Sequence, residues 1–408
     1  MTFNQFRTDE IELSSVITDI AAGPFGSNLK VSCFVPSGFP IIDGANLKGF
    51  KVTDNVTKFV TEEKAHSLER SIAHRGDVVS TISGTLGQIA YIPPDSKYEG
   101  YLCSQRQFRI TFDPEKVYVP YIVFYFHTRE GQHKILSFAS QVGVPALAQP
   151  LKNFRKIRIY LPDLEVQKRI ASVVEAINDK IEQNERINDN LEQQAAAMFH
   201  DLFVVHADPS WSEGTISDLG TVVGGSTPSK AKPEYYTDHG IAWITPKDLS
   251  VDKSKFVSHG ADDITELGLR NSSASIMPRG TVLFSSRAPI GYIAIADGEV
   301  TTNQGFKSVI PHDNIGTAFV YYFLKAALHT IEGMASGSTF KEISGSAMRT
   351  VPAIIPDDDT LRRFKSFCDP LFQQQRTLEM QNRELAEIRD ALLPRLMAGE
   401  IDVSSITL

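Results

Sequence analysis

Two long segments of the chain repeat apolar residues at the alternating three- and four-residue spacing of a coiled coil, with Glu, Gln, Asn and Arg on the other faces. The first predicted seam contains Ile170, Val174, Ile177, Ile181, Leu191, Ala195, Met198 and Leu202, with Asn184 and Asn188 between them. The second contains Phe364, Phe367, Leu371, Leu378, Leu385, Ile388, Leu392 and Leu396, interrupted by Gln374 and Gln381. Two such seams in one chain most simply pair with each other. The alternatives are that each helix packs on its own globular region or that the helices mediate dimerisation.

The regions in front of these segments repeat one another. RGDVVSTISGTLGQIAYI (75–92) matches RGTVLFSSRAPIGYIAIA (279–296), so that Gly76 and Gly87 align with Gly280 and Gly291. Four further pairs of segments match in the same order in both copies, two before this match and two after it. They are Gly26-Ser27 with Gly225-Ser226, 40–47 with 242–249, Ser104-Gln105 with Asn303-Gln304, and 161–170 with 355–364. The order is kept while the separation drifts, as loop insertions and deletions would produce. The chain therefore contains two copies of one fold.

Each copy has the same predicted plan. Short alternating segments with frequent Gly and Pro indicate strands and turns, and a short apolar helix and a strand ending in Pro-Asp follow before the long helix. The predicted class is α+β, with two similar mixed α/β domains and an antiparallel coiled coil of pseudo-two-fold symmetry. The expected boundaries are 1–160 for the first domain, 161–204 for its helix, 205–355 for the second domain, and 356–408 for its helix and the C-terminal tail.

Composition places the chain among soluble proteins with real cores, since 42% of its residues are hydrophobic and 22% are charged. The three cysteines are widely spaced without a CxxC pattern, which supports neither a disulfide framework nor a zinc site. This cysteine usage favours a protein of the reducing cytoplasm. The acidic start has no apolar core of a signal peptide, and the longest apolar stretch, 118–126, is too short to span a bilayer. A cytoplasmic protein without membrane contact is expected.

The net charge of −8 argues mildly against nucleic-acid binding when it is averaged over the chain. The charge is unevenly distributed, however. Residues 1–164 carry 18 Lys and Arg against 16 Asp and Glu, whereas residues 204–358 carry 12 against 17. The average therefore conceals a more basic first copy, and composition alone leaves the partners open.

A search for catalytic motifs finds none. GGSTPSK (224–230) lacks the spacing of a phosphate-binding P-loop, and the sequence has neither a GxGxxG after a predicted strand nor an NPPY-like motif of amino-methyltransferases. The ten histidines are dispersed, without a ligand-like pair on one helix. The Pro-Asp pairs at 162–163 and 356–357 are explained by a strand-to-helix boundary. No catalytic, metal or cofactor site is predicted.

Both copies place polar side chains at turns between predicted strands, where they can contact DNA. Gln and Asn can contact adenine through two hydrogen bonds, and Arg or Lys can contact guanine. The candidates in the first copy are Asn46, Lys48, Ser83, Thr85, Gln105, Arg106, Arg109 and Lys152. Those in the second copy are Lys247, Asp248, Ser286, Arg287, Gln304, Lys307, Thr339 and Lys341. The alternative for each is an ordinary polar loop residue that satisfies nearby backbone.

The chain resembles the specificity (S) subunits of type I restriction–modification enzymes. The resemblance is carried by GPFGSNLK (23–30), GGSTPSK (224–230), GIAWITPKDL (240–249), RGTVLFSSRAPIG (279–291), TTNQGF (301–306), LPDLEVQKRIA (161–171) and ALLPRLMAGEIDV (391–403). The order of these motifs is more specific than any one of them. The second helix departs from the pattern, because it begins PDDDTLRRF instead of with a segment like EVQKR at 165–169.

The resemblance implies a non-catalytic chain with two target-recognition domains that each read half of a split site in double-stranded DNA. It also implies two DNA adenine-methyltransferase subunits as partners, with a motor-nuclease restriction subunit in the full complex. S-adenosylmethionine, ATP and magnesium would belong to those partners, and this chain would hold no cofactor. The alternative is a bivalent coiled-coil scaffold that binds protein, and the net charge of −8 is more consistent with a protein partner than with nucleic acid.

Overall fold

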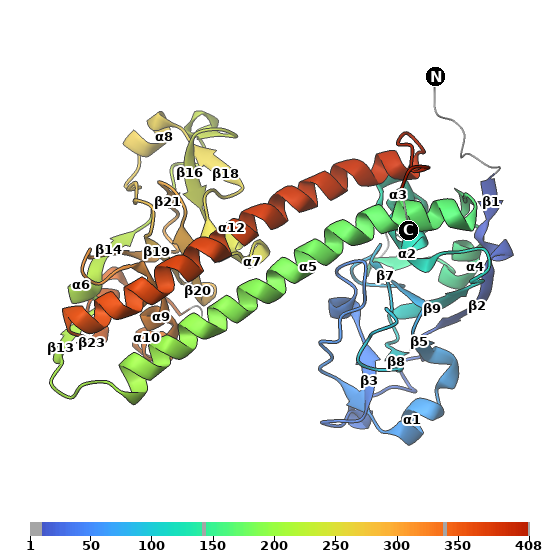
Figure 1. Cartoon of the computed structure of the whole chain (residues 1–408), viewed down its shortest axis with the longest axis horizontal. Coiled ribbons are helices and arrows are strands. Elements are labelled where there is room, and N and C mark those ends of the chain that lie inside the picture. The colour runs from blue at the N-terminus through green and yellow to red at the C-terminus, as the bar shows by residue number, and fades with distance from the viewer. Residues whose placement is uncertain (1–9, 141–143, 338–340, 407–408) are drawn as a thin grey trace. The chain divides into compact units, whose positions relative to one another are not determined.

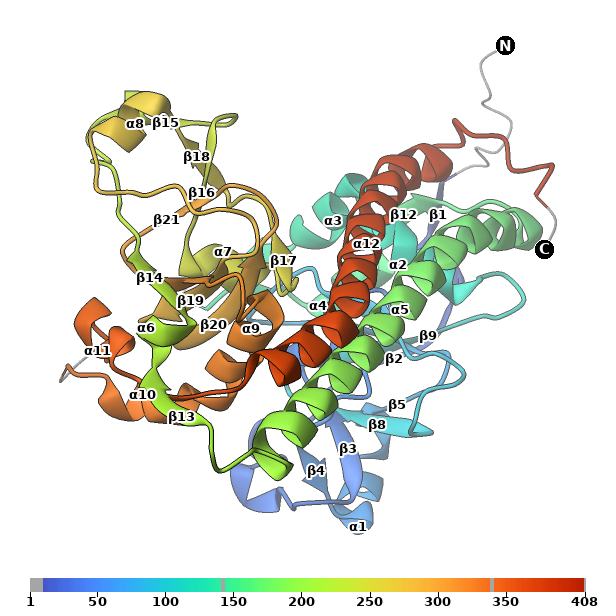
Figure 2. The same cartoon turned by 60° about the vertical axis from the view of Figure 1, so that its left-hand side comes forward.

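The computed structural model describes residues 10–140, 144–337 and 341–406. Contacts divide the chain into two units, the first comprising 1–180 with 385–408 and the second 181–384. Each unit contains one globular domain and a part of each long helix, α5 (Leu164–His200) and α12 (Asp358–Met397) (Figures 1 and 2). Within the described ranges, no helix combines the length and apolar character needed to cross a membrane.

The first domain is built on two four-stranded sheets, ordered β2-β9-β6-β7 and β4-β3-β8-β5, with the strand pairs β1-β12 and β10-β11 beside them. The strands are β1 (Glu10–Glu12), β2 (Ile17–Ala22), β3 (Phe39–Ile42), β4 (Phe59–Val60), β5 (Ile72–His74), β6 (Val78–Thr81), β7 (Ile89–Tyr91), β8 (Gly100–Cys103), β9 (Gln107–Phe112), β10 (Ala139–Ser140), β11 (Ala146–Leu147) and β12 (Arg158–Tyr160). The shorter helices are α1 (Glu62–His66), α2 (Val119–His127), α3 (Arg129–Leu136) and α4 (Pro150–Arg155).

The second domain repeats this plan with a five-stranded sheet, β14-β22-β19-β20-β17, a four-stranded sheet, β15-β18-β16-β21, and the pair β13-β23. The strands are β13 (Ser212–Thr215), β14 (Gly220–Gly224), β15 (Tyr236–Thr237), β16 (Ile241–Ile244), β17 (Phe256–Val257), β18 (Asp262–Ile264), β19 (Val282–Ser286), β20 (Ile290–Ala296), β21 (Thr301–Thr302), β22 (Lys307–Pro311) and β23 (Pro352–Ile355). The shorter helices are α6 (Ile216–Leu219), α7 (Pro246–Val251), α8 (Glu266–Arg270), α9 (Thr317–Ala326), α10 (Leu328–Met334) and α11 (Gly345–Arg349).

The glycines of the repeat confirm that the two domains share one chain path. Gly76 and Gly280 have φ values of 88° and 89°, and Gly87 and Gly291 have values of 83° and 97°. These left-handed conformations favour glycine because it has no Cβ. Such a conformation at both members of two aligned pairs is expected of equivalent turns.

One alignment made from the sequence is wrong by three residues. Gly225 lies so close to the carbonyl of Asn303 that a Cβ on this residue would be 2.0 Å from the carbonyl oxygen. In the first domain Gly23, and not Gly26, has this relationship, with the carbonyl of Ser104. The sequence alignment selected the Gly-Ser dipeptide, whereas the conserved feature of the two loops is a close approach of backbone to backbone.

The central strands are buried on both faces, which explains their continuous apolar sequences. Val78 of β6 packs in the core shared with α2 and α5, while the adjacent Val79 packs in a second core between the two sheets. In β19, Phe284 and Leu283 divide in the same way between two cores. Successive side chains point to opposite faces of a strand. The sheet that contains β6, and likewise the sheet that contains β19, therefore packs against helices on one face and against the other sheet of its domain on the opposite face.

The two long helices pair with each other in antiparallel fashion. In the second unit Asn184 Nδ2 donates to Asn382 Oδ1 at 2.8 Å, and Gln375 Nε2 donates to the carbonyl of Asn188 at 3.1 Å. The residue number falls along α12 as it rises along α5. The predicted fold class, with intramolecular pairing of the helices, is confirmed.

The predicted seam of the second helix is partly wrong. Phe367 and Ile388, both assigned to the seam, are 37% and 49% exposed, whereas Cys368 is fully buried. Gln375 and Asn382, each one position after the predicted Gln374 and Gln381, form the shorter hydrogen bonds to α5, while Gln381 Oε1 also accepts from Asn184 Nδ2 at 3.5 Å. Near Phe367 the reason is that α12 packs on the second domain as well as on α5, so its buried surface includes Cys368 and is wider than a two-helix seam.

Candidate nucleic-acid interface

Three loops of the first domain enclose a polar cleft of about 590 Å³. They follow β3, join β6 to β7, and join β8 to β9. Five of the predicted DNA-contacting residues line it: Lys48, Ser83, Thr85, Gln105 and Arg106. Residues separated by almost 60 positions in the sequence are therefore brought to one surface, which we call the first cleft.

Hydrogen bonds tie the loops of the first cleft together. Gln88 Nε2 donates to the carbonyl of Gly44 at 3.0 Å, which links the β6–β7 loop to the loop after β3. The backbone N–H of Ile82 donates to the carbonyl of Arg106 at 2.6 Å, which links the β6–β7 and β8–β9 loops. Loops fixed in this way lose less conformational entropy when they bind a ligand.

The second domain has a corresponding cleft of about 390 Å³, the second cleft, lined by the predicted residues Lys247, Arg287 and Gln304. Its loops follow β16, join β19 to β20, and join β21 to β22, as in the first domain. The carboxylate of Asp248 accepts a hydrogen bond from the backbone N–H of Thr245 at 2.7 Å and caps α7. The structure thus gives Asp248 a role in fixing the first turn of α7, which carries Lys247.

An apolar surface adjoins the first cleft, and sequence reasoning did not identify its most exposed residue. Phe25 is 84% exposed and lies with Leu151 on a hollow of about 730 Å³ that also includes Gln105, Arg106 and Lys152. The loop that carries Phe25 packs closely on Gln105, since a Cβ on Gly26 would be only 2.6 Å from Gln105 Oε1. The available signal was a single aromatic residue between Pro and Gly in GPFGSN.

Two predicted residues of the first domain have structural partners instead of a place in the first cleft. Asn46 is only 3% exposed, and its side-chain amide donates to the carbonyls of Thr53 and Asn55 at 3.0 and 3.1 Å. Arg109 is 9% exposed and forms an ion pair with Asp19 at 2.6 Å. The Arg109 contact is also the leading reason why the pKa of Asp19 is lowered.

In the second domain, the predicted residues Ser286 and Lys307 surround Glu342. Lys307 Nζ lies 3.5 Å from one carboxylate oxygen of Glu342, and Arg287 lies 3.4 Å from the other. Ser286 is fully buried beneath them. Lys341 is exposed but lines neither cleft. Thr339 lies outside the described residues.

The cations of the two clefts differ in how far they are neutralised. Lys58 lies 2.8 Å from Asp43. Burial raises the pKa of Asp43, but Lys58 and the hydrogen bond from the backbone N–H of Ala45 together lower it below its usual value. Within the part of the chain that the structure describes, Lys48, Arg106 and Lys247 form no ion pair. These three exposed charges are therefore available to an anionic partner. No cluster of metal-ligating side chains occurs among the described residues.

Comparison with known proteins agrees with this architecture. The family profile described as the type I restriction modification DNA specificity domain matches the chain twice, over residues 35–193 and 209–388. The chain belongs to this family. The two matches fall on the two domains and their helices, so the internal repeat is a repeat of the specificity domain.

Individual members of the specificity family show the same relationship. The chain is 38% identical to the type I restriction enzyme MjaIX specificity subunit of Methanocaldococcus jannaschii over 183 residues, which cover 44% of this chain and 41% of that protein. It is 25% identical to the HindI specificity subunit of Haemophilus influenzae, over 60% of this chain and 69% of that one. The crystal structure of an S subunit from M. genitalium shares the fold, with a TM-score of 0.59, 16% identity and 96% coverage of both chains. The alignment with the first relative thus spans less than half of that protein.

Proposed function

We propose that this chain is the DNA-recognition subunit of a type I restriction–modification complex and that each cleft reads one half of a bipartite target in double-stranded DNA. The observation that carries the proposal is the equivalence of the two clefts. Equivalent loops in the two domains present a glutamine, Gln105 between β8 and β9 and Gln304 between β21 and β22. A basic residue accompanies each glutamine, but from different loops: Arg106 follows Gln105 directly, whereas Arg287 comes from the β19–β20 loop of the second cleft. Gln is suited to adenine and Arg to guanine in the major groove.

The remaining exposed cations suit phosphate contacts. Lys48, Lys152 and Lys247 present long, strongly hydrated ammonium groups around these loops. Contacts of this kind orient a protein on the duplex without carrying sequence information. The excess of acidic residues over 204–358 limits the number of phosphates that the second domain can neutralise, so partner subunits must supply part of the affinity.

The chain is the non-catalytic component of the assembly in this proposal. Two adenine-methyltransferase subunits bind it and supply S-adenosylmethionine chemistry, and a restriction subunit supplies ATP- and magnesium-dependent cleavage. The domain division at 160, 204 and 355 is part of the same proposal, with the clefts inside the first and third segments and the helices between and after them.

Co-expression tests the proposal directly. The chain and its methyltransferase subunit are expressed in a bacterial host without other adenine methylation, and N6-methyladenine is mapped across the chromosome. We expect one bipartite motif with a fixed spacer, and no motif when the chain is omitted. Replacing both Gln105 and Arg106 with Ala should degrade one half-site alone. A continuous motif, or methylation independent of the chain, would contradict the proposal.

A further inference from the structure

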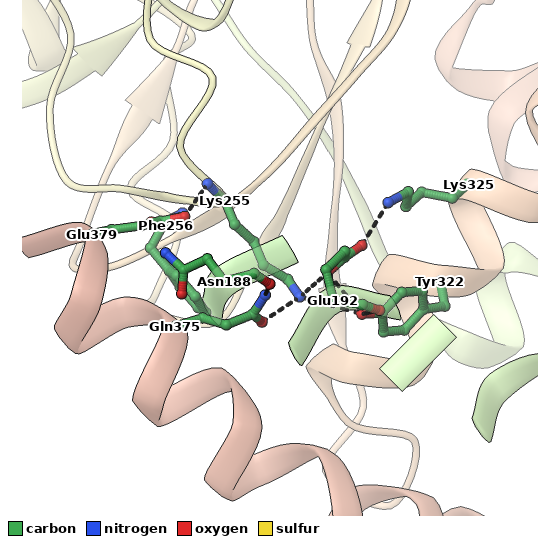
Figure 3. A network of polar contacts seen from close by, with 8 residues as sticks. All are labelled: Asn188, Glu192, Lys255, Phe256, Tyr322, Lys325, Gln375 and Glu379. Atoms are coloured by element: carbon green, nitrogen blue, oxygen red, sulfur yellow. Dashed lines mark hydrogen bonds and ion pairs between the residues drawn. The ribbon is translucent and has the colours of Figure 1, made fainter. Parts of the chain in front are cut away.

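A lysine of the second domain is buried against both long helices within the second unit. Lys255 immediately precedes β17 and is 7% exposed. Its Nζ donates to Glu192 Oε2 of α5 at 2.7 Å and to Gln375 Oε1 of α12 at 2.9 Å (Figure 3). Gln375 in turn donates to the carbonyl of Asn188 on α5. One side chain of the domain therefore contacts both helices at the point where they are themselves bridged.

Aromatic rings surround the same ammonium group. Lys255 Nζ lies 3.6 Å from the ring centroid of Phe372 and 4.6 Å from that of Tyr321. Such contacts stabilise a cation, most strongly where water is excluded. Burial lowers the pKa of Lys255 to about 8, with Glu192 acting in the opposite direction, so the group is still mainly protonated at pH 7.

The neighbouring backbone is held by a second carboxylate. Glu379 of α12 accepts hydrogen bonds from the N–H groups of Lys255 and Phe256, at 2.8 and 3.1 Å (Figure 3). Glu192 also accepts hydrogen bonds from Lys325 and Tyr322 of α9, at 2.7 and 2.8 Å. These contacts fix both β17 and α9 of the domain to the helices.

The first domain uses the equivalent position with the opposite chemistry. The carbonyl of Phe50 accepts a hydrogen bond from Tyr91, as the carbonyl of Lys255 does from Ile295. In the first unit, the ring of Phe50 lies 5.3 Å from the guanidinium group of Arg389 on α12. The domain thus supplies the ring and the helix the cation, whereas in the second unit the domain supplies the cation. The position is a contact to the helices in both domains, but only the second uses a buried lysine.

We infer that Lys255 and Glu379 are positioning residues that fix the orientation of the second cleft on the helical pair and thereby determine which spacer length between the half-sites is accepted. This rests on the proposed function. A buried ion pair pays for desolvation, and a well-packed apolar replacement is often equally stable, so stability does not explain why the lysine is there. Its contribution is directional, because the ammonium and carboxylate groups specify their partners by hydrogen-bond geometry.

The test compares spacer selectivity between variants of the full chain, each co-expressed with the methyltransferase subunit. Lys255→Met retains the length of the side chain and its contact with the rings but removes the charge. Lys255→Arg keeps a cation that can stack on Phe372 and reach Glu192. Lys253→Met is the matched control, since Lys253 is exposed and lies two residues away. Methylation is measured on plasmids that carry the mapped motif with the native spacer and with spacers one base pair shorter or longer.

We expect Lys255→Met to fold, to keep both half-site sequences, and to raise methylation at the altered spacers at least fivefold relative to the native spacer. Lys255→Arg and Lys253→Met should keep the wild-type ratio. Glu379→Gln, which leaves the lysine in place, should change the ratio in the same direction by a smaller factor. Thermal unfolding of each complex separates misfolding from reorientation.

A wild-type spacer ratio in a folded Lys255→Met complex would overturn the inference. So would a changed base preference in either half-site, because that would assign Lys255 to reading the DNA. If Lys255→Met does not fold, Glu379→Gln decides, and a wild-type ratio there overturns the inference. A wild-type chain that gives no bipartite motif at all would instead refute the proposed function.

Discussion

Asn184 of α5 is fully buried and donates a hydrogen bond from Nδ2 to Asn382 Oδ1 of α12 at 2.8 Å. Its own Oδ1 has no hydrogen-bond partner among the residues that the structure describes. A buried polar pair inside a helical contact specifies register at a cost in stability. The asparagine pair therefore defines which residues of the two helices face each other.

Replacing both Asn184 and Asn382 with Leu should raise stability and loosen register. Removing the unsatisfied Oδ1 and placing one buried and one half-buried apolar side chain at the contact should increase the free energy of unfolding by about 1–2 kcal/mol. Urea denaturation of the chain checks this value, with Asn190→Leu, at an exposed position of the same helix, as the control. A less stable double variant would show that the pair contributes net stability as well as register.

Arg287→Ala should affect the second half-site alone. Arg287 lines the second cleft and lies 3.4 Å from Glu342. Under the proposed function, removing it eliminates the base contact expected of it and leaves the first domain undisturbed. The expected loss is about 1–3 kcal/mol of discrimination at one base pair. The measurement is the methylated motif, and Arg270→Ala, at an exposed site in α8, is the control. Equal weakening of both half-sites would assign Arg287 to folding or to phosphate contact.

Phe25→Ala should weaken recognition of the first half-site without lowering stability. The ring is 84% exposed, so its removal costs the folded chain little, whereas covering it with DNA would contribute about 1–3 kcal/mol. Apolar side chains contact the methyl group of thymine in the major groove. Methylation rates on the native target check the prediction. Val31→Ala, at a position 81% exposed outside the clefts, should be neutral, and an equal effect of both variants would remove Phe25 from the reading surface.

His127→Gln should reduce the loss of stability of the chain in mild acid. Burial is the main reason why the pKa of His127 is lowered from 6.5, while its hydrogen bond with the carbonyl of Ile89 acts in the opposite direction. Below pH 6.5 the unfolded state therefore binds more protons than the folded state, and the free energy of unfolding falls as the pH falls. Denaturation at pH 7.5 and 5.5 should show a smaller decrease for the variant, and an equal decrease would show that His127 does not titrate differently on folding.

The sequence could predict those features that depend on periodicity. The two helices, the repeat and the strand-rich domains follow from apolar spacing and from glycines such as Gly76 and Gly280, whose conformations are set locally. The loops that carry Lys48, Gln105 and Arg287 could also be identified, because turns expose polar residues. Which of these residues share a cleft depends on the sheet order, and no local pattern encodes that order.

Burial of polar side chains was the main source of difference between expectation and structure. Asn46 has an amide of the kind that contacts bases, but this amide is buried and donates to the backbone carbonyls of Thr53 and Asn55. Lys255 is an ordinary surface lysine by sequence, and only the packing of β17 on two helices places it among aromatic rings. The assignment of Lys255 requires the positions of Glu192 and Gln375, which are 63 and 120 residues away along the chain.

Lengthening both helices by one heptad should lengthen the spacer. The insertions are made between Lys180 and Ile181 in α5 and between Glu384 and Leu385 in α12, where the two units meet in the sequence. Seven residues keep the helical contact in phase and add about 10 Å, which corresponds to about 3 base pairs of DNA. The half-site sequences should stay unchanged in the methylation map.

Rotation limits the size of this effect. Three base pairs also turn the far half-site by close to a third of a helical turn, so methylation at the new spacer should be weaker than at the native spacer of the wild-type chain. Insertion into α5 alone should be worse, because the helical contacts of the two units can then no longer all stay in register: if Asn184 keeps Asn382 in the second unit, Arg389 loses Asn178 in the first. The methylated motif of each variant is compared with that of the wild type. Robust methylation at the original spacer by the double-insertion chain would mean that the helices do not set the distance between the two reading surfaces.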